Sequence, residues 1–374
     1  MPPIVIDLRQ TDDSRDVVHR AVQTLAEGGL VVFPTETVYG VGASARSAAG
    51  VEKLFVAKGR SLDAPFALAI KSAEEALDYV PQLGTMAERL ARRCWPGPVT
   101  LVVGQGEDRG LVSQLPESVR RAVAPNGTVG LRVPAHSIVL SVLQMLAGPI
   151  ALTSANLSGE PAAVTAKQAV ESLGNRVDLV LDDGRSRYGQ ASTVVRATGN
   201  ECTCIREGVV GRQALDRLSS MIVLLVCTGN TCRSPMAEVI MRRLVAEKMG
   251  CSESELDQQG TIIASAGIAA APGCGPSREA VTVMQEGGLD LSKHASQPLT
   301  DKLVRHADVI FTMTEGHRNA ILRRWPDSSP RIHTLRPDGK DIQDPIGGSI
   351  NIYRECAEEV KSALRRRVDE LDLH

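Results

Sequence analysis

The sequence predicts two α/β domains joined end to end, and three observations carry this prediction. The chain has 374 residues, more than the roughly 100–200 residues of a single domain. Short apolar runs alternate with helical patterns along the whole chain, which is typical of α/β folds. Hydrophobic residues make up 43% of the sequence and charged residues 23%, as in ordinary globular proteins.

The first half predicts a mixed sheet with helices packed on it, not a simple doubly wound sheet. The apolar run 30–34 predicts a strand, which a glycine-rich loop and a helix over 48–58 follow. Ser72 and Glu75 have the spacing of a capping box, which favours a helix through Tyr79. Further strands are expected at 65–70, 99–103, 129–133, 149–153, 179–181, 192–195 and 202–205.

The boundary between the two domains is expected just before Met221. Residues 213–220 carry no strong pattern, so we expect them to link a domain of residues 1–212 to one of residues 221–374. Beyond Met221, strands alternate with helices, which predicts a parallel sheet with helices on both faces. The expected strands are 222–226, 261–264 and 308–313, and the expected helices are 235–248, 277–287, 301–306, 315–324 and 349–370.

Charge and cysteine spacing exclude several classes of function. A net charge of −2 argues against a protein whose main task is to wrap nucleic acid. The eight cysteines contain no C-x2-C pair and the seven histidines are scattered, so neither a disulfide framework nor a protein-held metal is expected. No signal peptide and no apolar run of membrane-spanning length is found, so a cytoplasmic location with reduced thiols and without membrane contact is expected.

The strongest chemical signal is the segment 223–238, VLLVCTGNTCRSPMAE. An apolar strand leads into Cys227, and Arg233 follows six positions later, which gives the spacing C-x5-R. Ser234 is expected to cap the next helix, with Pro235 at its first position. Arg233 supplies a planar fork that matches two oxygens of a phosphate group.

The residues between the cysteine and the arginine favour an anion-binding loop. Gly229 and Asn230 are residue types that tolerate left-handed backbone angles. Backbone N–H groups from Thr228 onward can therefore turn inward at a helix N-terminus. This positive environment favours the thiolate of Cys227, which would attack phosphorus and form a phosphocysteine intermediate. Asp344, just before the last predicted helix, is a candidate to protonate the leaving group.

With these motifs, the segment from Ile222 to about Leu371 resembles the low-molecular-weight protein-tyrosine-phosphatase family. Besides the cysteine loop it matches at SAG (265–267), DVIFTM (308–313) and DP (344–345). The resemblance implies a four-stranded parallel sheet and no cofactor. It also implies these roles: Cys227 as nucleophile, Arg233 as transition-state clamp, Asp344 as general acid, Ser234 orienting the thiolate and Asn230 holding the loop.

The other residues of the loop bear on regulation and on the choice of substrate. The resemblance implies that Cys232 can form a reversible protective disulfide with the nucleophile, and that Thr228 and Gly229 help to form the loop. Thr231 and the sequence Ile346-Gly347-Gly348 after the DP are similar to the protein-arginine-phosphatase branch. Tyrosine-specific members usually carry an apolar residue in place of Thr231 and aromatic residues after the DP. Phosphoarginine is therefore favoured, and phosphotyrosine stays open.

Arsenate reduction is a rival for the second half, because arsenate reductases share the cysteine loop. That chemistry needs a relay of further cysteines in one flexible segment. Only Cys274 stands in a suitable place, and no second cysteine is near it in the sequence. The sequence therefore favours a phosphatase.

In the first half, cations and hydroxyl groups gather at predicted strand ends. Lys58 and Arg60 lie at a helix end, Arg132 follows a strand, and Ser154 and Asn156 stand in a polar turn after another strand. Such a set predicts a site for an anionic ligand such as a nucleotide. Neither a Walker A sequence nor a G-x-G-x-x-G fingerprint is present, so a P-loop or Rossmann cofactor site is excluded.

The motifs PTETVYG (34–40), KGR (58–60) and SAN (154–156) resemble the YrdC-type threonylcarbamoyl-AMP synthase family, across nearly all of residues 10–212. The resemblance implies a twisted mixed sheet around a basic pocket. It implies that L-threonine, bicarbonate and ATP, with Mg²⁺, give threonylcarbamoyl-adenylate and pyrophosphate. This product feeds N6-threonylcarbamoyl modification of tRNA, which the protein would meet only indirectly, through downstream transfer enzymes.

The resemblance also assigns residues to the two substrates of this reaction. Thr35 and Arg132 are expected to hold threonine. The expected nucleotide-binding residues are Lys58, Arg60, Ser154, Asn156, Ser192 and Arg206. The alternative is an RNA-binding module without synthase activity, but Tyr39, Tyr79 and Tyr188 are too far apart in sequence to indicate a stacking platform. The sequence therefore predicts a bifunctional enzyme.

Overall fold

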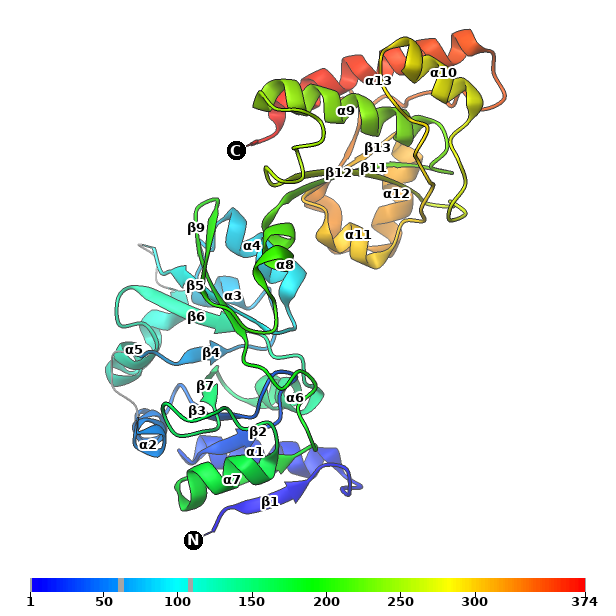
Figure 1. The fold of residues 1–374 in the computed structure, drawn as a ribbon. Coiled ribbons are helices and arrows are strands. Elements are labelled where there is room, and N and C mark those ends of the chain that lie inside the picture. Colours follow the sequence, from blue (N-terminus) through cyan, green and yellow to red (C-terminus); the bar gives the residue numbers. More distant parts are fainter. Residues whose placement is uncertain (1, 60–63, 107–109, 374) are drawn as a thin grey trace. The chain divides into compact units, whose positions relative to one another are not determined.

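A computed structural model describes residues 2–59, 64–106 and 110–373 of the chain (Figure 1). The chain folds as two compact units, the first unit of residues 1–218 and the second unit of residues 219–374. Each unit has its own sheet and its own hydrophobic clusters. Within the described ranges, no helix has both the length and the apolar character needed to cross a membrane.

The first unit is built on one ten-stranded mixed sheet, as the sequence predicted. The strands are β1 (Ile4–Asp7), β2 (Val31–Phe33), β3 (Gly40–Ser44), β4 (Ala67–Ala69), β5 (Val99–Gly104), β6 (Thr128–Arg132), β7 (Ile150–Ser154), β8 (Leu179–Asp182), β9 (Thr193–Thr198) and β10 (Glu201–Arg206). Their order is β1-β8-β2-β3-β7-β4-β6-β5-β9-β10. The sheet contains both parallel pairs, such as β5 with β9, and antiparallel pairs, such as β3 with β7.

Helices cover both faces of this sheet. They are α1 (Ser14–Ala26), α2 (Ala48–Lys58), α3 (Ala76–Tyr79), α4 (Thr85–Cys94), α5 (Glu117–Val123), α6 (Ser137–Met145), α7 (Ala166–Leu173) and α8 (Arg212–Ser219), with 3₁₀ turns at Gly110–Gln114 and Gly174–Arg176. One hydrophobic cluster joins α1 and α6 to the face that carries Val31 and Phe33. A larger cluster joins α2, α4, α5 and α7 to the opposite face, where Leu30 and Val32 point. Successive residues of β2 thus enter different clusters, as strand geometry requires.

The glycine-rich segment after β2 contains a strand that the sequence did not reveal. β3 pairs with both β2 and β7, and glycine at position 42 makes this close pairing possible. A Cβ at Gly42 would come within 2.4 Å of a methyl carbon of Ile150 on β7. The glycines therefore mark a close approach of two strands, not a loop.

Several other elements of the first unit were not predicted. The edge strand β1 is partly exposed and pairs only with β8. No helix was predicted at the positions of α1, α4, α5, α6 and α7, although each of them buries apolar residues. At the predicted capping box, the Glu75 N–H donates to Ser72 Oγ at 3.2 Å, and helix α3 begins at Ala76.

The segment that was expected to be a linker is largely a helix. α8 begins at Arg212 and ends at Ser219, and Leu215 is buried in the larger hydrophobic cluster of the first unit. Arg93 of α4 also donates a hydrogen bond to the carbonyl of Leu218 at 2.6 Å. These contacts attach α8 to the first unit, and the second unit begins just after it.

The second unit has four parallel strands with helices on both faces, as predicted. The strands are β11 (Met221–Cys227), β12 (Thr261–Gly267), β13 (Val309–Thr312) and β14 (Ile332–Thr334), in the order β12-β11-β13-β14. The helices are α9 (Arg233–Met249), α10 (Arg278–Glu286), α11 (Asp301–His306), α12 (Glu315–Arg324) and α13 (Ile350–Glu370), with a 3₁₀ turn at Pro326–Arg331. Only β14, which has three residues, was too short for its pattern to be recognised.

Strand β11 explains why the second site lies where it does. Val223 and Leu225 pack with α9, α10 and α13 on one face, whereas Leu224 and Val226 pack with α11 and α12 on the other (Figure 1). A strand buried on both faces is a continuous apolar run. It ends at Cys227, at the carboxyl edge of the sheet, where α/β folds place their ligands.

The packing of α8 predicts where a loss of stability will appear. Leu215→Ala should lower the free energy of unfolding of the first unit by about 2–5 kcal/mol, because it leaves a cavity in a buried cluster. Gln213→Ala, at an exposed position of the same helix, is the control and should have little effect. Trp95 and Trp325 are the two tryptophans, so 5-fluorotryptophan gives one ¹⁹F resonance for each unit during urea unfolding. A loss confined to the Trp325 resonance would contradict the assignment of α8 to the first unit.

Two candidate active sites

The thiol of Cys227 is held by its own loop and by the first turn of α9. Cys227 is buried, with 3% of its surface exposed. Its Sγ lies 3.0 Å from Ser234 Oγ and accepts a hydrogen bond from the backbone N–H of Asn230 at 3.2 Å. The hydroxyl of Ser234 and the backbone N–H of Asn230 therefore both contact the sulfur.

Ser234 does not cap α9, which corrects one prediction. The helix begins at Arg233, the capping position belongs to Cys232, and no side chain accepts a capping hydrogen bond there. Ser234 therefore lies inside the first turn, fully buried. Because its hydroxyl does not serve the helix backbone, it is available to the sulfur of Cys227.

Asn230 organises the loop through its backbone and its amide. Among the described residues, Asn230 is the one non-glycine with a left-handed backbone, with φ of 54°. Its Nδ2 donates to Ser234 Oγ at 2.9 Å and to Ser265 Oγ at 2.8 Å. Its Oδ1 accepts from the backbone N–H of Gln297 at 2.9 Å. Ser234 Oγ therefore accepts from this amide and lies within hydrogen-bonding distance of both the Cys227 sulfur and the carbonyl of Ala266, the latter at 3.5 Å.

The chain of hydrogen bonds extends to a carboxyl group that the sequence analysis missed. Ser265 Oγ donates to Glu238 Oε2 at 2.6 Å. Burial raises the pKa of Glu238, against the lowering effect of this hydrogen bond. His294 Nε2 lies 2.9 Å from the carbonyl oxygen of Asn230. Glu238 and Ser265 stand in the quoted motifs MAE and SAG, so their motifs were visible but their contacts were not.

Arg233 and Asp344 meet at the mouth of the loop. The guanidinium forms an ion pair with Asp344 and donates to the carbonyl of Ile342 at 3.3 Å. The side chain of Arg233 is 6% exposed and that of Asp344 is 40% exposed. The N–H of Ile346 donates to the other oxygen of Asp344 at 3.3 Å. A phosphate group that enters the loop must therefore compete with Asp344 for Arg233.

His317, on α12, is a second residue that the sequence analysis missed. Its Nε2 lies 2.8 Å from Thr228 Oγ1, and the residue is 6% exposed. Burial, and next the positive charge of Arg233, lower the pKa of His317 from 6.5 to about 4. The imidazole is therefore neutral near pH 7 and supports the loop without adding charge.

The remaining cysteines of the second unit form no disulfide. Cys232 Sγ lies 3.5 Å from the hydroxyl of Tyr353, and burial together with this neighbour raises the pKa of Tyr353 to about 12. The disulfide expected between Cys227 and Cys232 stays a prediction. Burial raises the pKa of Cys356 to about 12, which keeps that thiol protonated and unreactive. Cys274 is exposed, and no disulfide joins it to another cysteine.

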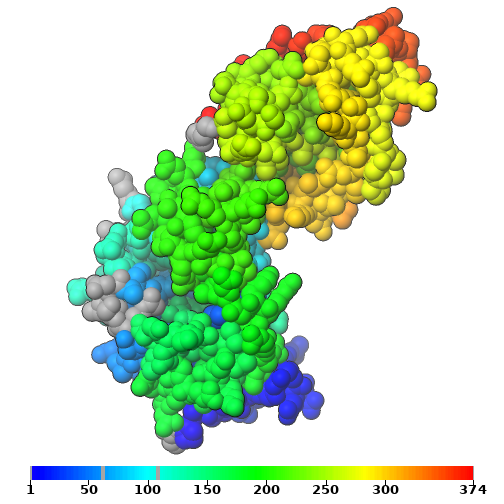
Figure 2. All heavy atoms as spheres, viewed as in Figure 1, coloured from blue at the N-terminus to red at the C-terminus, as the bar shows by residue number. Residues whose placement is uncertain are grey.

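The first unit contains a cavity of about 670 Å³ that gathers the predicted residues of the first half. The strands and loops that line this cavity lie far apart in sequence. Many of the lining segments belong to the C-terminal part of the unit, which is green in the space-filling view (Figure 2). The predicted residues that line it are Thr35, Lys58, Arg132, Ser154, Asn156, Ser192 and Arg206. Arg60, the remaining predicted residue, lies outside the described residues.

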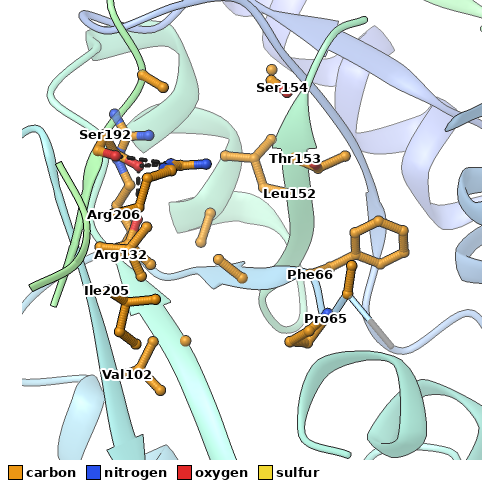
Figure 3. Close-up of a pocket in the computed structure, with 18 of the residues that line it drawn as sticks. Pro65, Phe66, Val102, Arg132, Leu152, Thr153, Ser154, Ser192, Ile205 and Arg206 are labelled. Carbon is orange, nitrogen blue, oxygen red and sulfur yellow. Dashed lines mark hydrogen bonds between the residues drawn. The ribbon is translucent and has the colours of Figure 1, made fainter. Parts of the chain in front are cut away.

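On one side of the cavity, Ser192 and Arg206 lie together and face β7 (Figure 3). Arg206 Nη2 donates to the carbonyl of Ser192 at 2.8 Å and to its Oγ at 3.3 Å. Ser192 Oγ also lies 3.0 Å from Thr100 Oγ1. Burial, and next the nearby charge of Arg132, lower the pKa of Arg206. Two neighbouring cations on one side of a cavity favour an anionic ligand (Figure 3).

Lys58 shapes the turn that follows β7. It is 2% exposed, and its Nζ donates to the carbonyl of Ser154 at 2.6 Å, to the carbonyl of Asn156 and to Asn156 Oδ1 at 3.4 Å. Asn156 Nδ2 in turn donates to the carbonyls of Leu157 and Glu160, both at 2.8 Å. In this structure, Lys58 therefore holds the SAN turn in place beneath the cavity.

Arg132 is paired with a carboxylate that the sequence analysis did not assign. Its Nη2 donates to Glu36 Oε1 at 2.7 Å and to Thr37 Oγ1 at 2.9 Å, and all three residues are buried. Thr35 Oγ1 lies 2.8 Å from Thr37 Oγ1 and donates to the carbonyl of Val38 at 2.6 Å. The PTET motif therefore holds the guanidinium of Arg132 in place.

Arg196 also lines the cavity and was missed, because nothing in its local sequence distinguishes it from a surface arginine.

The lowered pKa of His317 predicts how the stability of the second unit depends on pH. In the unfolded chain the imidazole binds a proton below about pH 6.5, whereas in the folded chain it stays neutral down to about pH 4. Between these two pH values the unfolded chain binds a proton that the folded chain does not. The free energy of unfolding therefore falls as the pH falls, and this group contributes up to about 1.4 kcal/mol per pH unit. His317→Gln should show a shallower fall in urea unfolding followed at the fluorine resonance of Trp325. Equal slopes for the two proteins would contradict a neutral, buried His317.

Comparison with known proteins identifies both halves. Residues 23–208 match the Sua5/YciO/YrdC family, described as telomere recombination, and residues 222–373 match the low molecular weight phosphotyrosine protein phosphatase family. A threonylcarbamoyl-AMP synthase of Pyrococcus abyssi is 34% identical over 58% of this chain, but the match spans only 60% of its own length. A putative threonylcarbamoyl-AMP synthase of Mycobacterium tuberculosis is 38% identical over 54% of this chain and 88% of its own.

The second half has relatives of its own. A protein-arginine-phosphatase of Bacillus subtilis is 34% identical over 40% of this chain and 97% of its own length.

Among solved structures, a Sua5 variant of Pyrococcus abyssi aligns with 89% of this chain and 99% of its own, at 25% identity and a TM-score of 0.52. The chain therefore belongs to the Sua5/YciO/YrdC family over its first half and to the low-molecular-weight protein phosphatase family over its second half.

Proposed function

We propose that the chain is a bifunctional enzyme, a threonylcarbamoyl-AMP synthase over residues 1–212 and a protein arginine phosphatase over residues 221–374. The single observation that carries the first activity is the gathering of seven predicted side chains around one cavity. The observation that carries the second is the buried Cys227 thiol, hydrogen-bonded within a loop whose mouth holds Arg233 and Asp344.

The cavity of the first unit supports adenylation of a carbamate. L-threonine and bicarbonate combine, with loss of water, to a carbamate whose oxygen attacks the α-phosphorus of ATP and releases pyrophosphate. Thr35 and Arg132 hold threonine in this scheme. Arg206 and Ser192 face the phosphates, where a fixed cation stabilises the charge that develops on the leaving pyrophosphate.

Magnesium is expected to accompany ATP, but the described side chains form no evident coordination site for it. In the parts of the chain that the structure describes, no group of three or more His, Cys, Asp or Glu side chains could hold a metal ion. We therefore assign no step of the reaction to a metal. The protein's own contributions to catalysis come from the arginines and hydroxyl groups of the cavity.

The alternative for the first half, an RNA-binding module without catalysis, is not favoured. Tyr39 is 0% exposed and Tyr79 is 2% exposed, so neither ring can stack on a base. Tyr188 is exposed but stands alone among the three. The proposed link to tRNA is therefore indirect, through enzymes that take up the adenylate.

In the second unit, the geometry supports hydrolysis through a phosphocysteine. Cys227 attacks phosphorus, and Arg233 leaves Asp344 to bind two oxygens of the phosphoryl group. The released carboxylate of Asp344 takes up a proton from solvent and donates it to the leaving nitrogen or oxygen. It then takes a proton from the water that cleaves the phosphorus–sulfur bond. Asp344 is suited to this exchange because its side chain is 40% exposed and can move away from the arginine.

Phosphoarginine is the proposed substrate of the second unit, in preference to phosphotyrosine. Thr231 places a hydroxyl group in the loop, and its Oγ1 lies 3.7 Å from Cys232 Sγ. After Asp344 the wall of the site consists of Ile346, which is 69% exposed, and two glycines. A phenyl ring finds no aromatic partner in this segment. The relative from Bacillus subtilis supports the same choice.

We also propose a cytoplasmic location. The proposed mechanism needs Cys227 as a free thiol, and the structure joins none of the eight cysteines to another. Thiols persist in reducing compartments, and a cysteine nucleophile is active only when reduced. ATP and phosphoproteins, the proposed substrates, then occur in the same compartment.

The synthase proposal predicts pyrophosphate release that requires both threonine and bicarbonate. Arg206→Ala should slow this release by at least about tenfold, because a hydrogen bond between a guanidinium and a phosphate is lost. Arg176→Ala, which removes an exposed arginine outside the cavity, should leave the rate unchanged. Pyrophosphate release that continues without threonine would sink the proposal.

The phosphatase proposal predicts faster hydrolysis of phosphoarginine peptides than of phosphotyrosine peptides, with Cys227→Ser as the blank. Thr231→Ile should move the ratio of kcat/KM toward phosphotyrosine by about tenfold, because a polar contact to the substrate is replaced by an apolar wall. The ratio is measured on the full chain with both peptides in competition. A wild-type preference for phosphotyrosine would overturn the assignment to arginine.

A further inference from the structure

The first unit has a second cavity, which the proposed reaction does not use. Its volume is about 340 Å³, and it is lined by residues 34–36, 96–98 and 183–188 together with Ala135 and His136. His136 occupies the capping position of α6, so the cavity lies at the positive end of a helix dipole. Thr35 lines both this cavity and the first one.

The loop of residues 183–188 is rigidly built without a ligand. The hydroxyl of Tyr39, which is buried, accepts from the N–H of Asp183 at 3.1 Å and donates to the carbonyl of Gly184 at 2.7 Å. The N–H of Ser186 donates to the carbonyl of Val164 at 2.9 Å. The side chains of the loop are therefore presented from a fixed backbone.

Two arginines of this loop supply positive charge. Arg185 and Arg187 both line the cavity and are exposed. Neither forms an ion pair with any residue that the structure describes, and the guanidinium of Arg187 lies over the ring of Tyr188 at 5.3 Å. Their forks of N–H donors are free to meet the oxygens of a ligand.

The carboxylates of the cavity are already paired. Glu36 accepts from Arg132 at 2.7 Å and from the backbone N–H of Ala135 at 2.9 Å. Asp183 lies 3.1 Å from His136 Nε2. Because Arg132 balances the charge of Glu36, the two arginines of the loop outweigh the remaining carboxylate, Asp183, and together with the helix end they leave an excess of positive charge.

Two buried polar atoms of the cavity have no partner. Ser186 is 7% exposed, and its Oγ is buried without a hydrogen bond to any described residue. The Nδ1 of His136 is also buried without a hydrogen bond to any described residue. A buried polar atom left unpaired costs roughly 1–3 kcal/mol, so each such atom in a native protein calls for an explanation. An acceptor oxygen of a ligand would satisfy the hydroxyl of Ser186.

We propose that this second cavity is a binding site for a phosphate-type oxoanion, namely inorganic phosphate or pyrophosphate. The volume is several times that of a water molecule, about 30 Å³, and therefore has room for a diphosphate. Arg185 and Arg187 would bind its oxygens, and Ser186 would donate a further hydrogen bond. An anion here acts on the first cavity through Glu36, since the same carboxylate holds Arg132.

The test is a calorimetric titration of the full chain with inorganic pyrophosphate, and in parallel with phosphate and with bicarbonate. The chain carries Arg233→Ala, which removes the phosphate clamp of the second unit, and saturating α,β-methylene-ATP occupies the first cavity. The double variant Arg185→Ala/Arg187→Ala should weaken pyrophosphate binding by at least about tenfold. Ser186→Ala should weaken it by a smaller factor, and Arg176→Ala, the matched control, should leave it unchanged.

Each contrary outcome has a definite meaning. Binding that is absent, or unchanged in the double variant, would overturn the proposal. Binding of bicarbonate alone would overturn the assignment to a phosphate-type ligand. Because the titration measures binding and not turnover, failure of the proposed synthase activity would leave its result intact. Far-ultraviolet circular dichroism of the double variant distinguishes loss of the site from loss of the fold.

Discussion

Both sites depend on a polar group that is buried beside the end of a strand and has to be hydrogen-bonded. In the second unit this group is the amide of Asn230, whose partners are the hydroxyls of Ser234 and Ser265. In the first unit it is the ammonium of Lys58, whose partners are the carbonyls of Ser154 and Asn156. A buried polar group without partners costs roughly 2–7 kcal/mol, so each loop keeps the shape that satisfies its group before any substrate arrives. Fixed loops are what phosphoryl transfer requires, because its catalysis consists mostly of positioning and charge stabilisation.

Each site also contains an arginine that is paired with a carboxylate. Pairing avoids the penalty of an uncompensated buried charge, which is large. The two pairs differ in the exposure of the acid: the side chain of Asp344 is 40% exposed and that of Glu36 is 6% exposed. In the proposed mechanism, Asp344 therefore moves into solvent when a phosphate binds Arg233, and is then free to carry a proton. Glu36 has no such route, so it stays with Arg132 and fixes the floor of the first cavity.

The two activities are independent in their chemistry and in their supporting structure. Each unit has its own sheet and its own hydrophobic clusters, and each proposed site is complete within one unit. The adenylate formed by the first reaction is not a substrate for a phosphocysteine enzyme. The one helix between them, α8, is attached to the first unit through Leu215. Its local sequence gave no clear pattern, because a single buried leucine in eight residues leaves no readable periodicity.

The sequence by itself determined the fold class, the family of each half and the motif residues of both sites, because each of these depends on spacing within a short segment. The run from Val223 to Arg233, for example, predicts a strand, a loop and a helix from local pattern alone. Only the tertiary structure decided which groups from distant segments meet, such as His317 with Thr228 or Glu36 with Arg132. It also showed that Ser234 does not cap α9, although its contact with the thiol agrees with the role that the resemblance implied. The reason is physical: burial and hydrogen bonding are set by what packs against a residue, and no local pattern records that.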